Sequence, residues 1–325
     1  MIYKKILVTG SSAVLGTGLK NIAGNYLNRE FIFWSSNNCD LTDLQATNES
    51  VKEVAPDAIL HLAAVSGGIG LSMKHHASML RDINLMTFSI LEAARKNGVK
   101  KTIMTLTTGM YPPDVPLPLN EENIHDGYPH GSNYGSSFAK RIVDPAIKAY
   151  RDEYDLNVIG LIPSGIFGEN DNFNYDDSPM LPALIRRFYE NRNNNEDIMI
   201  WGDGTSLREY TYSQDLAEIF MWALENYNEA QCLNIGTTEE NSIKDIAYMI
   251  AENINVNKSR IKFDTSKPKG IYRKNTDNSK FTRLLNYRYT PFREALKKII
   301  QWFCVTMEQN PEKIRLLSKS REVNS

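Results

Sequence analysis

The sequence has no long apolar run and almost no net charge. No stretch approaches the ~18 apolar residues that a membrane-spanning helix needs, and the N-terminus leads into a predicted strand over residues 6–9 without the apolar core of a secretory signal. The 37 Lys and Arg residues are balanced by 39 Asp and Glu residues, so the chain offers no broad attraction for a phosphate backbone. We therefore expect a cytoplasmic protein that binds neither membranes nor nucleic acid.

Cysteine is scarce, and the histidines show no metal-binding pattern. Cys39, Cys232 and Cys304 are far apart and form no CxxC pair, so neither a disulfide framework nor a zinc site is indicated. His75 and His76 are adjacent, and adjacent residues point apart on a helix. We predict that the chain holds no metal.

Apolar runs of strand length alternate with helical periodicity as far as Ile162. This alternation predicts an α/β fold with a doubly wound parallel (Rossmann) sheet. After Pro163 the predicted elements are shorter and less regular. We therefore expect a Rossmann domain over residues 1–162, mainly a smaller α/β substrate-binding lobe over residues 163–308, and a polar, partly disordered tail over residues 309–325.

A glycine-containing turn follows the first predicted strand. Residues 10–16 read Gly-Ser-Ser-Ala-Val-Leu-Gly, and a helical pattern follows at once. Glycines at such a turn let the backbone approach a pyrophosphate, and the helix N-terminus presents free N–H groups to it. Ala13 stands where a third glycine is frequent. The position at the start of a βαβ unit favours a dinucleotide site over a plain structural turn.

The next two predicted strands bear on the choice of cofactor. Residues 31–34 are followed by serines and asparagines, with no acidic residue before Asp40. An acid at the end of this strand binds the ribose 2′-hydroxyl and repels a 2′-phosphate, so its absence favours NADP(H) over NAD(H). The strand at 58–62 contains His61, which we interpret as a packed structural residue because it lies inside an apolar run.

A lysine on a predicted helix follows a strand that ends in hydroxyl side chains. The strand over residues 102–106 leads into Thr107, and Lys140 lies on an amphipathic segment that begins near Phe138. This arrangement is the framework of a proton-transfer site in nucleotide-sugar enzymes. The tyrosine expected four residues before the lysine is absent, and Ser136 stands in its place.

A series of short motifs, colinear over about residues 4–305, resembles the GDP-L-fucose synthase family of extended short-chain dehydrogenases/reductases, of the NAD-dependent epimerase/dehydratase type. The motifs are Val8-Thr9-Gly10, Asp40-Leu41-Thr42-Asp43, His61-Leu62-Ala63-Ala64, Ala139-Lys140-Arg141, Asp171-Asn172-Phe173, Leu181-Pro182, Trp201-Gly202, Arg208-Glu209, Ser242-Ile243-Lys244 and Phe263-Asp264-Thr265.

The resemblance implies an NADP(H)-dependent enzyme that epimerises C3 and C5 of GDP-4-keto-6-deoxymannose and then reduces C4. It also implies a homodimer, with contacts through the helices near residues 80–97 and 137–153. The implied cofactor-binding residues are Gly10, Ser12, Ala13, Val14, Leu15, Gly16, Ser36, Asp40, Leu41, Ala63, Ala64, Lys140 and Pro163.

The catalytic positions depart from the family pattern. Reduction there uses a tyrosine whose pKa is lowered by the lysine, beside a serine, and epimerisation uses a cysteine and a histidine. Thr107 fills the serine position and Lys140 its own. Ser136 replaces the tyrosine, Gly109 the cysteine and Pro179 the histidine. Because neither glycine nor proline titrates, we predict that this acid–base pair does not operate.

Three of the replacements are smaller than the family's residues. They are Gly109, Ser136 and Gly165, the last of which stands for an asparagine. The pocket is therefore expected to be wider, either to accept a bulkier sugar or to let water relay protons from Thr107 or Lys140.

Other residues could replace the missing donor. The hydroxyl of Ser136 is far less acidic than a phenol with its pKa near ~10. Tyr134 lies six residues before Lys140, which at about 100° per residue is off the lysine's helical face unless the helix begins after it. Tyr111, in the Pro- and Gly-rich segment 110–131, is a further candidate, although a loop tyrosine is ordinarily a packed aromatic.

The substrate-binding positions are better kept. Arginine and lysine side chains suit the oxygens of a diphosphate, and a tryptophan can flank a nucleotide base, although each is also an ordinary helix, loop or core residue. The residues that the resemblance implies are Gly109, Asn172, Arg187, Trp201, Arg208 and Lys274.

The sequence therefore leaves two functions open. One is a GDP-sugar epimerase/reductase-like oxidoreductase with altered or reduced catalysis. The other is a catalytically degraded protein that still holds NADP(H) or a GDP-sugar and regulates or scaffolds a partner enzyme. A purely structural role is disfavoured by the retained Lys140 and phosphate-site features.

Overall fold

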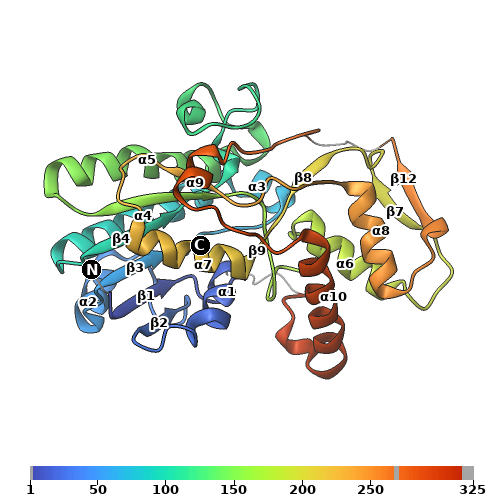
Figure 1. Ribbon diagram of the computed structural model, residues 1–325, viewed down its shortest axis with the longest axis horizontal. Coiled ribbons are helices and arrows are strands. Elements are labelled where there is room, and N and C mark those ends of the chain that lie inside the picture. Colours follow the sequence, from blue (N-terminus) through green and yellow to red (C-terminus); the bar gives the residue numbers. More distant parts are fainter. Residues whose placement is uncertain (1–2, 267–270, 317–325) are drawn as a thin grey trace.

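The structure, a computed structural model, describes residues 3–266 and 271–316 (Figure 1). Its largest element is a six-stranded sheet of order β2-β1-β3-β4-β5-β10, in which every paired strand is parallel. The predicted doubly wound fold is confirmed. The strands are β1 (Lys5–Thr9), β2 (Glu30–Trp34), β3 (Ala58–His61), β4 (Lys101–Thr105), β5 (Val158–Pro163) and β10 (Leu233–Ile235).

Helices cover both faces of this sheet because its strands are apolar on both sides. Leu7, Ile59 and Met104 pack under one helical layer, formed by α2 (Leu44–Val54), α4 (His76–Lys96) and α5 (Tyr134–Tyr154). On the opposite face Val8 and Leu60 pack under α1 (Val14–Ala23) and α7 (Ser213–Asn226). The sheet is therefore buried, and its strand ends are the places left for a ligand.

The strand order reverses at β1. This strand lies between β2 and β3, with Thr9 opposite both Trp34 and His61. The chain thus passes from β1 to β2 on one side and crosses back to β3 on the other. Ligands of open α/β sheets bind at the carboxyl ends of the strands where such a reversal opens a crevice.

A smaller lobe lies beside the sheet, to the right in Figure 1. Its apolar core is built from α6 (Met180–Glu190), α8 (Ile243–Ile254) and α10 (Phe292–Gln309). Three two-stranded pairs complete it: β6 (Ile166–Phe167) with β9 (Thr211–Tyr212), β8 (Leu207–Glu209) with β11 (Glu240–Ser242), and β7 (Ile198–Trp201) with β12 (Ile261–Asp264). Shorter connecting elements are α3 (Ile69–Lys74), α9 (Ser279–Leu284), η1 (Thr108–Met110), η2 (Glu121–His125), η3 (Gly131–Asn133), η4 (Lys258–Arg260) and η5 (Pro311–Lys313).

The chain does not divide cleanly at residue 162. The sixth strand of the large sheet, β10, and the helix α7 on its face both come from the second half of the chain. The predicted boundary at 162/163 is therefore only approximate, because the chain enters the lobe, returns to the sheet and enters the lobe again.

The start of the predicted tail is ordered. Ile314 is buried in the lobe, and the N–H of Phe173 donates to the carbonyl of Arg315 at 3.0 Å. Residues 317–325 of the predicted tail lie outside the described residues.

Two sequence predictions concern absences. Within residues 3–266 and 271–316, no helix is long and apolar enough to cross a membrane. In the same part of the chain, no group of three or more His, Cys, Asp or Glu residues is placed to hold a metal ion. Cys39, Cys232 and Cys304 are free thiols.

Candidate functional site

The turn after β1 needs its glycines. Gly10 has a φ of +71°, and a Cβ there would stand 2.6 Å from the backbone nitrogen of Ala63, beyond β3. A Cβ on Gly16 would stand 2.5 Å from the Cα of Ser11. Both contacts are too close for any side chain: Gly10 packs against the segment after β3, and Gly16 packs against Ser11 within the turn itself.

The same turn presents the N-terminus of α1. Ala13, the cap residue, has extended backbone (φ −94°, ψ 179°) and offers no side-chain acceptor to the first turn. The N–H groups at the start of the helix are thus available to an anion. Extended backbone suits any residue, so the alanine at the place of a third glycine leaves the turn intact.

The other predicted cofactor residues gather at this edge of the sheet. Ser36 lies in the turn that follows β2, and Ala63 and Ala64 follow β3. Pro163 ends β5 and is buried. Because parallel strands end at one edge, these positions face a common region.

Asp40 and Leu41 support the edge in a different way. Leu41 is buried in the core, and the Asp40 carboxylate accepts hydrogen bonds from the N–H and hydroxyl of Thr42 at 3.0 and 2.7 Å. Asp40 therefore shapes the loop before α2. No acidic side chain stands at the end of β2, as the sequence indicated.

His61 is a structural residue, as interpreted from the sequence. Its Nδ1 lies 2.9 Å from the Oγ1 of Thr9, on the neighbouring strand. Burial, and secondly the charge of Lys140, lower the pKa of His61 to about 3. The ring is therefore neutral at physiological pH and ties the ends of β1 and β3 together.

Lys140 lies at the centre of the candidate site. Its Nζ donates to the carbonyl of Thr105 at 2.6 Å, at the end of β4. Burial lowers the pKa of Lys140 to about 8, because no anion within the described residues compensates the charge. A lysine with this pKa can exchange a proton near neutral pH.

Gly109 is surrounded by polar groups. A Cβ at this position would stand 3.1 Å from the Nδ2 of Asn133, 3.4 Å from the Oγ of Ser137 and 3.5 Å from the Oγ1 of Thr107. The Thr107 hydroxyl accepts from the N–H of Gly109 at 3.2 Å, and the Ser137 hydroxyl donates to its carbonyl at 2.9 Å. Thr107 and Gly109 therefore lie together, beside the N-terminal end of α5.

The possible replacements for the missing phenol are placed differently. The Ser136 hydroxyl donates to the carbonyl of Asn133 at 3.0 Å. Tyr134 is the first residue of α5 and packs against the ring of His76, with 4.6 Å between the centroids, so it lies off the helical face of Lys140. Tyr111 is buried, and its hydroxyl donates to the Oδ1 of Asn234 at 2.8 Å.

The sequence also predicted replacements at Gly165 and Pro179. A Cβ on Gly165 would stand 2.4 Å from the carbonyl oxygen of Glu209. The backbone of β8 therefore occupies the space that an asparagine side chain at this position would need. The widening expected from the sequence is not found at this position. Pro179 precedes α6 and brings no titratable group.

The predicted diphosphate residues Arg208 and Lys274 are brought together. Burial, and secondly the charge of Arg208, lower the pKa of Lys274 to about 8. Burial also lowers the pKa of Arg208. Two buried cations, one of which lowers the pKa of the other, suit an anion, which would offset the repulsion and the cost of burial.

The remaining predicted substrate residues differ in their freedom. Trp201, the last residue of β7, is 61% exposed. The Arg187 side chain donates to the carbonyl of Met199, on the same strand, at 2.6 Å. Asn172 is buried, and its Nδ2 donates to the carbonyl and carboxylate of Asp177 at 3.1 and 2.8 Å. Asn172 therefore holds the loop before α6, whereas Trp201 is open to a ligand.

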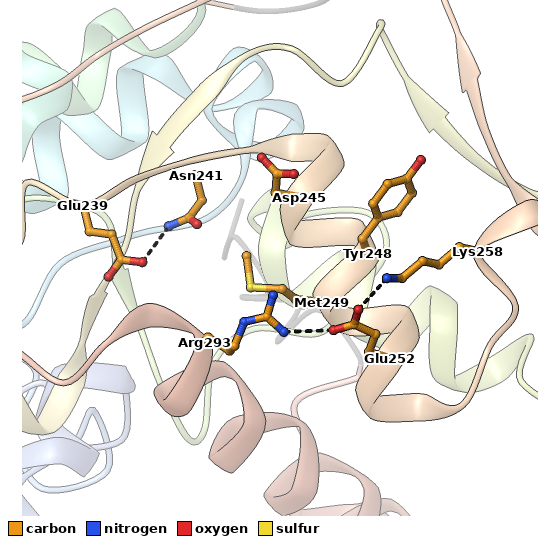
Figure 2. Close-up of a pocket in the computed structure, with 8 residues that line it drawn as sticks. All are labelled: Glu239, Asn241, Asp245, Tyr248, Met249, Glu252, Lys258 and Arg293. Atoms are coloured by element: carbon orange, nitrogen blue, oxygen red, sulfur yellow. Dashed lines mark hydrogen bonds and ion pairs between the residues drawn. The ribbon is translucent and has the colours of Figure 1, made fainter.

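A hollow of about 340 Å³ lies elsewhere in the lobe, between α8 and α10 (Figure 2). Its cations, Lys258 and Arg293, both pair with Glu252, and Arg293 does so at 2.9 Å. None of the predicted cofactor or substrate residues lines it. The lining residues are Glu239, Asn241, Asp245, Tyr248, Met249, Glu252, Lys258 and Arg293. With its cations already neutralised and acids in excess, this hollow does not suit a diphosphate.

Comparison with known proteins identifies the class. A sequence profile of the NAD dependent epimerase/dehydratase family matches residues 6–236. The chain therefore belongs to this family. The GDP-L-fucose synthase of Dictyostelium discoideum is 35% identical to it over 305 residues, which cover 92% of this chain and 95% of that protein.

Two more relatives extend the likeness. The probable GDP-L-fucose synthase of Drosophila melanogaster is 32% identical over 318 residues, which cover 94% of this chain and 99% of that protein. The crystal structure of a GDP-L-fucose synthetase from Naegleria fowleri bound to NADP matches with a TM-score of 0.88, at 32% identity and 96% coverage of both chains. The resemblance predicted from the motifs is confirmed.

Sequence reasoning missed several residues of this region. Asn133 and Ser137 border Gly109, and Tyr210 packs beside Gly165, with its Cδ1 3.3 Å from where a Cβ would stand. Asn133 immediately precedes α5 and Ser137 lies in its first turn, so their place beside the predicted helix start was the available signal. Tyr210 directly follows the Arg208-Glu209 motif but has no pattern of its own.

Proposed function

We propose that this chain is a cytoplasmic, NADP(H)-dependent oxidoreductase that reduces the 4-keto group of a GDP-linked sugar. One observation supports this most directly: Lys140 on α5 is buried, and its Nζ donates to the carbonyl of Thr105, the last residue of β4, which leads into Thr107 and Gly109. The glycine turn lies at the same edge of the sheet. The cation pair of Arg208 and Lys274 supports a diphosphate ligand, and the relatives' names supply the nucleotide and the cofactor.

The residues of the site fit a dinucleotide. Gly10 has no side chain, so the turn can lie close against Ala63. The uncapped start of α1 provides N–H donors for a pyrophosphate, from Ser12 through Leu15. The polar turn at Ser36, without an acid, accommodates a 2′-phosphate. Bound NADPH would supply a hydride to C4 of the keto sugar.

The chain's own task is to supply the proton. When hydride adds to C4, the carbonyl electron pair moves to oxygen, and that oxygen takes one proton. The Lys140 ammonium has a pKa of about 8 and is the acid available at this point, acting directly or through a water held by the Thr107 or Ser136 hydroxyl. The neutral amine then recovers a proton from solvent.

Epimerisation at C3 and C5 is not part of the proposal. That chemistry needs a base on one face of the sugar and an acid on the other. Gly109 and Pro179 supply neither. The proposed activity is therefore the reduction alone, without the epimerisation that the resemblance implies.

We propose a homodimer as well. Leu85 and Phe88 on α4 and Ile142 on α5 are exposed apolar side chains on adjacent helices. A second copy of the same two helices would cover them, as the resemblance implies. Light scattering of the purified chain, with charged substitutions at Phe88 and Ile142, tests this assembly.

The loss of the phenol favours a second candidate function, a protein that holds NADP(H) or a GDP-sugar without turnover and acts on a partner enzyme. Calorimetric titration with NADPH, NADH, GDP and GDP-mannose, followed by NADPH consumption with GDP-4-keto-6-deoxymannose, separates the two. Turnover supports the reductase. Tight binding of NADPH and GDP without turnover on a panel of GDP-4-keto sugars supports the holding protein, and binding of neither ligand contradicts both.

A further inference from the structure

The side chain of the residue that precedes α5 does not cap the helix. Its N-cap residue is Asn133, with φ −137° and ψ 22°, and the side chain makes no capping hydrogen bond. Asparagine is among the most effective N-cap residues and typically contributes about 1 kcal/mol through such a bond. Here that contribution is forgone, so the amide serves another purpose or none.

The amide instead faces the place vacated by the family's cysteine. The Nδ2 of Asn133 lies 3.1 Å from where a Cβ of residue 109 would stand. The Oδ1 of the same amide is buried and has no hydrogen-bond partner among the described residues. A buried acceptor left in this state costs free energy, which a ligand that donates to it would recover.

The neighbouring hydroxyls are already engaged, and the amide is not. Ser137 donates to the carbonyl of Gly109, and Thr107 accepts from its N–H. The Asn133 amide can both donate from Nδ2 and accept at Oδ1, which is the pairing that a sugar hydroxyl requires. GDP without an attached hexose brings no hexose hydroxyl to this point, since its diphosphate is proposed to bind at Arg208 and Lys274.

We propose that Asn133 is a specificity-determining residue whose amide binds a ring hydroxyl of the ligand's sugar, in the space opened by Gly109. This inference rests on the proposed GDP-sugar site. Gly109 is part of the same device, because a Cβ at 3.1 Å from Nδ2 is tighter than nine in ten real Cβ contacts and would push the amide aside.

The test compares GDP-mannose with GDP, because both contain ribose but only GDP-mannose carries a hexose on the diphosphate. Calorimetric titration of Asn133→Ala is expected to reduce the ratio of GDP-mannose affinity to GDP affinity at least about tenfold, with NADPH affinity unchanged. The matched control is Asn123→Ala, whose amide bonds Asp126 in an exposed turn, and it should leave the ratio unchanged. An unchanged ratio in Asn133→Ala overturns the inference.

A second variant guards against loss of folding. Gly109→Cys keeps Asn133 but displaces its amide, so it should lower the same ratio while the melting temperature stays close to that of the parent. A parent chain that binds GDP and NADPH, but GDP-mannose no tighter than GDP, overturns this inference and leaves the nucleotide and cofactor sites standing. A parent chain that binds neither GDP nor NADPH contradicts the proposed function itself.

Discussion

The ammonium group of Lys140 donates to the carbonyl oxygen of Thr105 at 2.6 Å, inside the protein. Because burial lowers the pKa of Lys140 to about 8, the lysine is protonated below that pH and neutral above it. A reduction that takes its proton from this group requires the protonated form. We therefore expect the rate of NADPH oxidation to fall as the pH rises through about 8.

Lys140→Met tests this dependence and should lower the rate on the order of 100-fold or more, with the pH limb lost from the residual rate. Lys101 provides a matched control, since burial lowers its pKa to about 8 as well, but its Nζ bonds the carbonyl of Tyr227 under α7. Lys101→Met should retain the limb. A limb that persists in Lys140→Met would rule out the lysine as its source.

Restoring the phenol should increase reduction. Ser136 lies one helical turn before Lys140, so Ser136→Tyr places a more acidic hydroxyl beside the ammonium. We expect NADPH oxidation with GDP-4-keto-6-deoxymannose to rise about 10²-fold, the lower range for general acid catalysis. Ser136→Phe adds the same bulk without the hydroxyl and should not raise the rate. An equal gain in both variants would mean that filling the pocket, and not acidity, is responsible.

Two of the three positions at which the resemblance implies a larger residue should tolerate that residue unequally. Gly109→Cys meets only side-chain atoms at 3.1 Å or more, whereas Gly165→Asn meets the backbone oxygen of Glu209 at 2.4 Å. We expect Gly165→Asn to lose about 1–3 kcal/mol of unfolding free energy, measured in urea, and Gly109→Cys to lose less. Gly24→Asn, where nothing lies within 4 Å, is the control for the substitution itself. Equal stability of Gly165→Asn and Gly24→Asn would contradict the packing argument.

Binding of a diphosphate should be coupled to proton uptake. Lys274 has its pKa lowered to about 8 by burial and by Arg208, and a bound diphosphate would raise that pKa again. GDP binding should therefore take up a proton at pH 8–9 and almost none at pH 6. Calorimetry in buffers of different ionisation enthalpy measures the uptake, and Lys274→Gln should abolish it. Uptake that survives in this variant would assign it to another group.

The architecture was predictable where the pattern is local. The amphipathic pattern near Phe138 predicted the helix that carries Lys140, and α5 begins four residues earlier, at Tyr134. The return of β10 to the large sheet was not predictable, since three residues, Leu233–Ile235, carry no signal of which neighbour they pair with. Strand pairing over long sequence separations is decided by tertiary packing.

The site was predictable as positions but not as contacts. The motifs single out Thr107, Gly109 and Lys140, which the structure brings to the end of β4, and the roles that they imply for these residues stay predictions. They gave no sign that the Asn172 side chain bonds Asp177 within its own loop, or that the backbone of Glu209 fills the space beside Gly165. Both depend on how loops distant in the chain meet.

The late position of β10 has a consequence for synthesis. Until residue 226 has left the ribosome, α7 cannot cover one face of the nascent sheet, and until residue 235 has left it, the edge of β5 lacks its partner strand. An N-terminal fragment that ends at residue 162 would expose an unpaired strand and apolar surface, which favours aggregation. The large sheet can therefore be completed only after residues 163–232, which include much of the smaller lobe, have been synthesised.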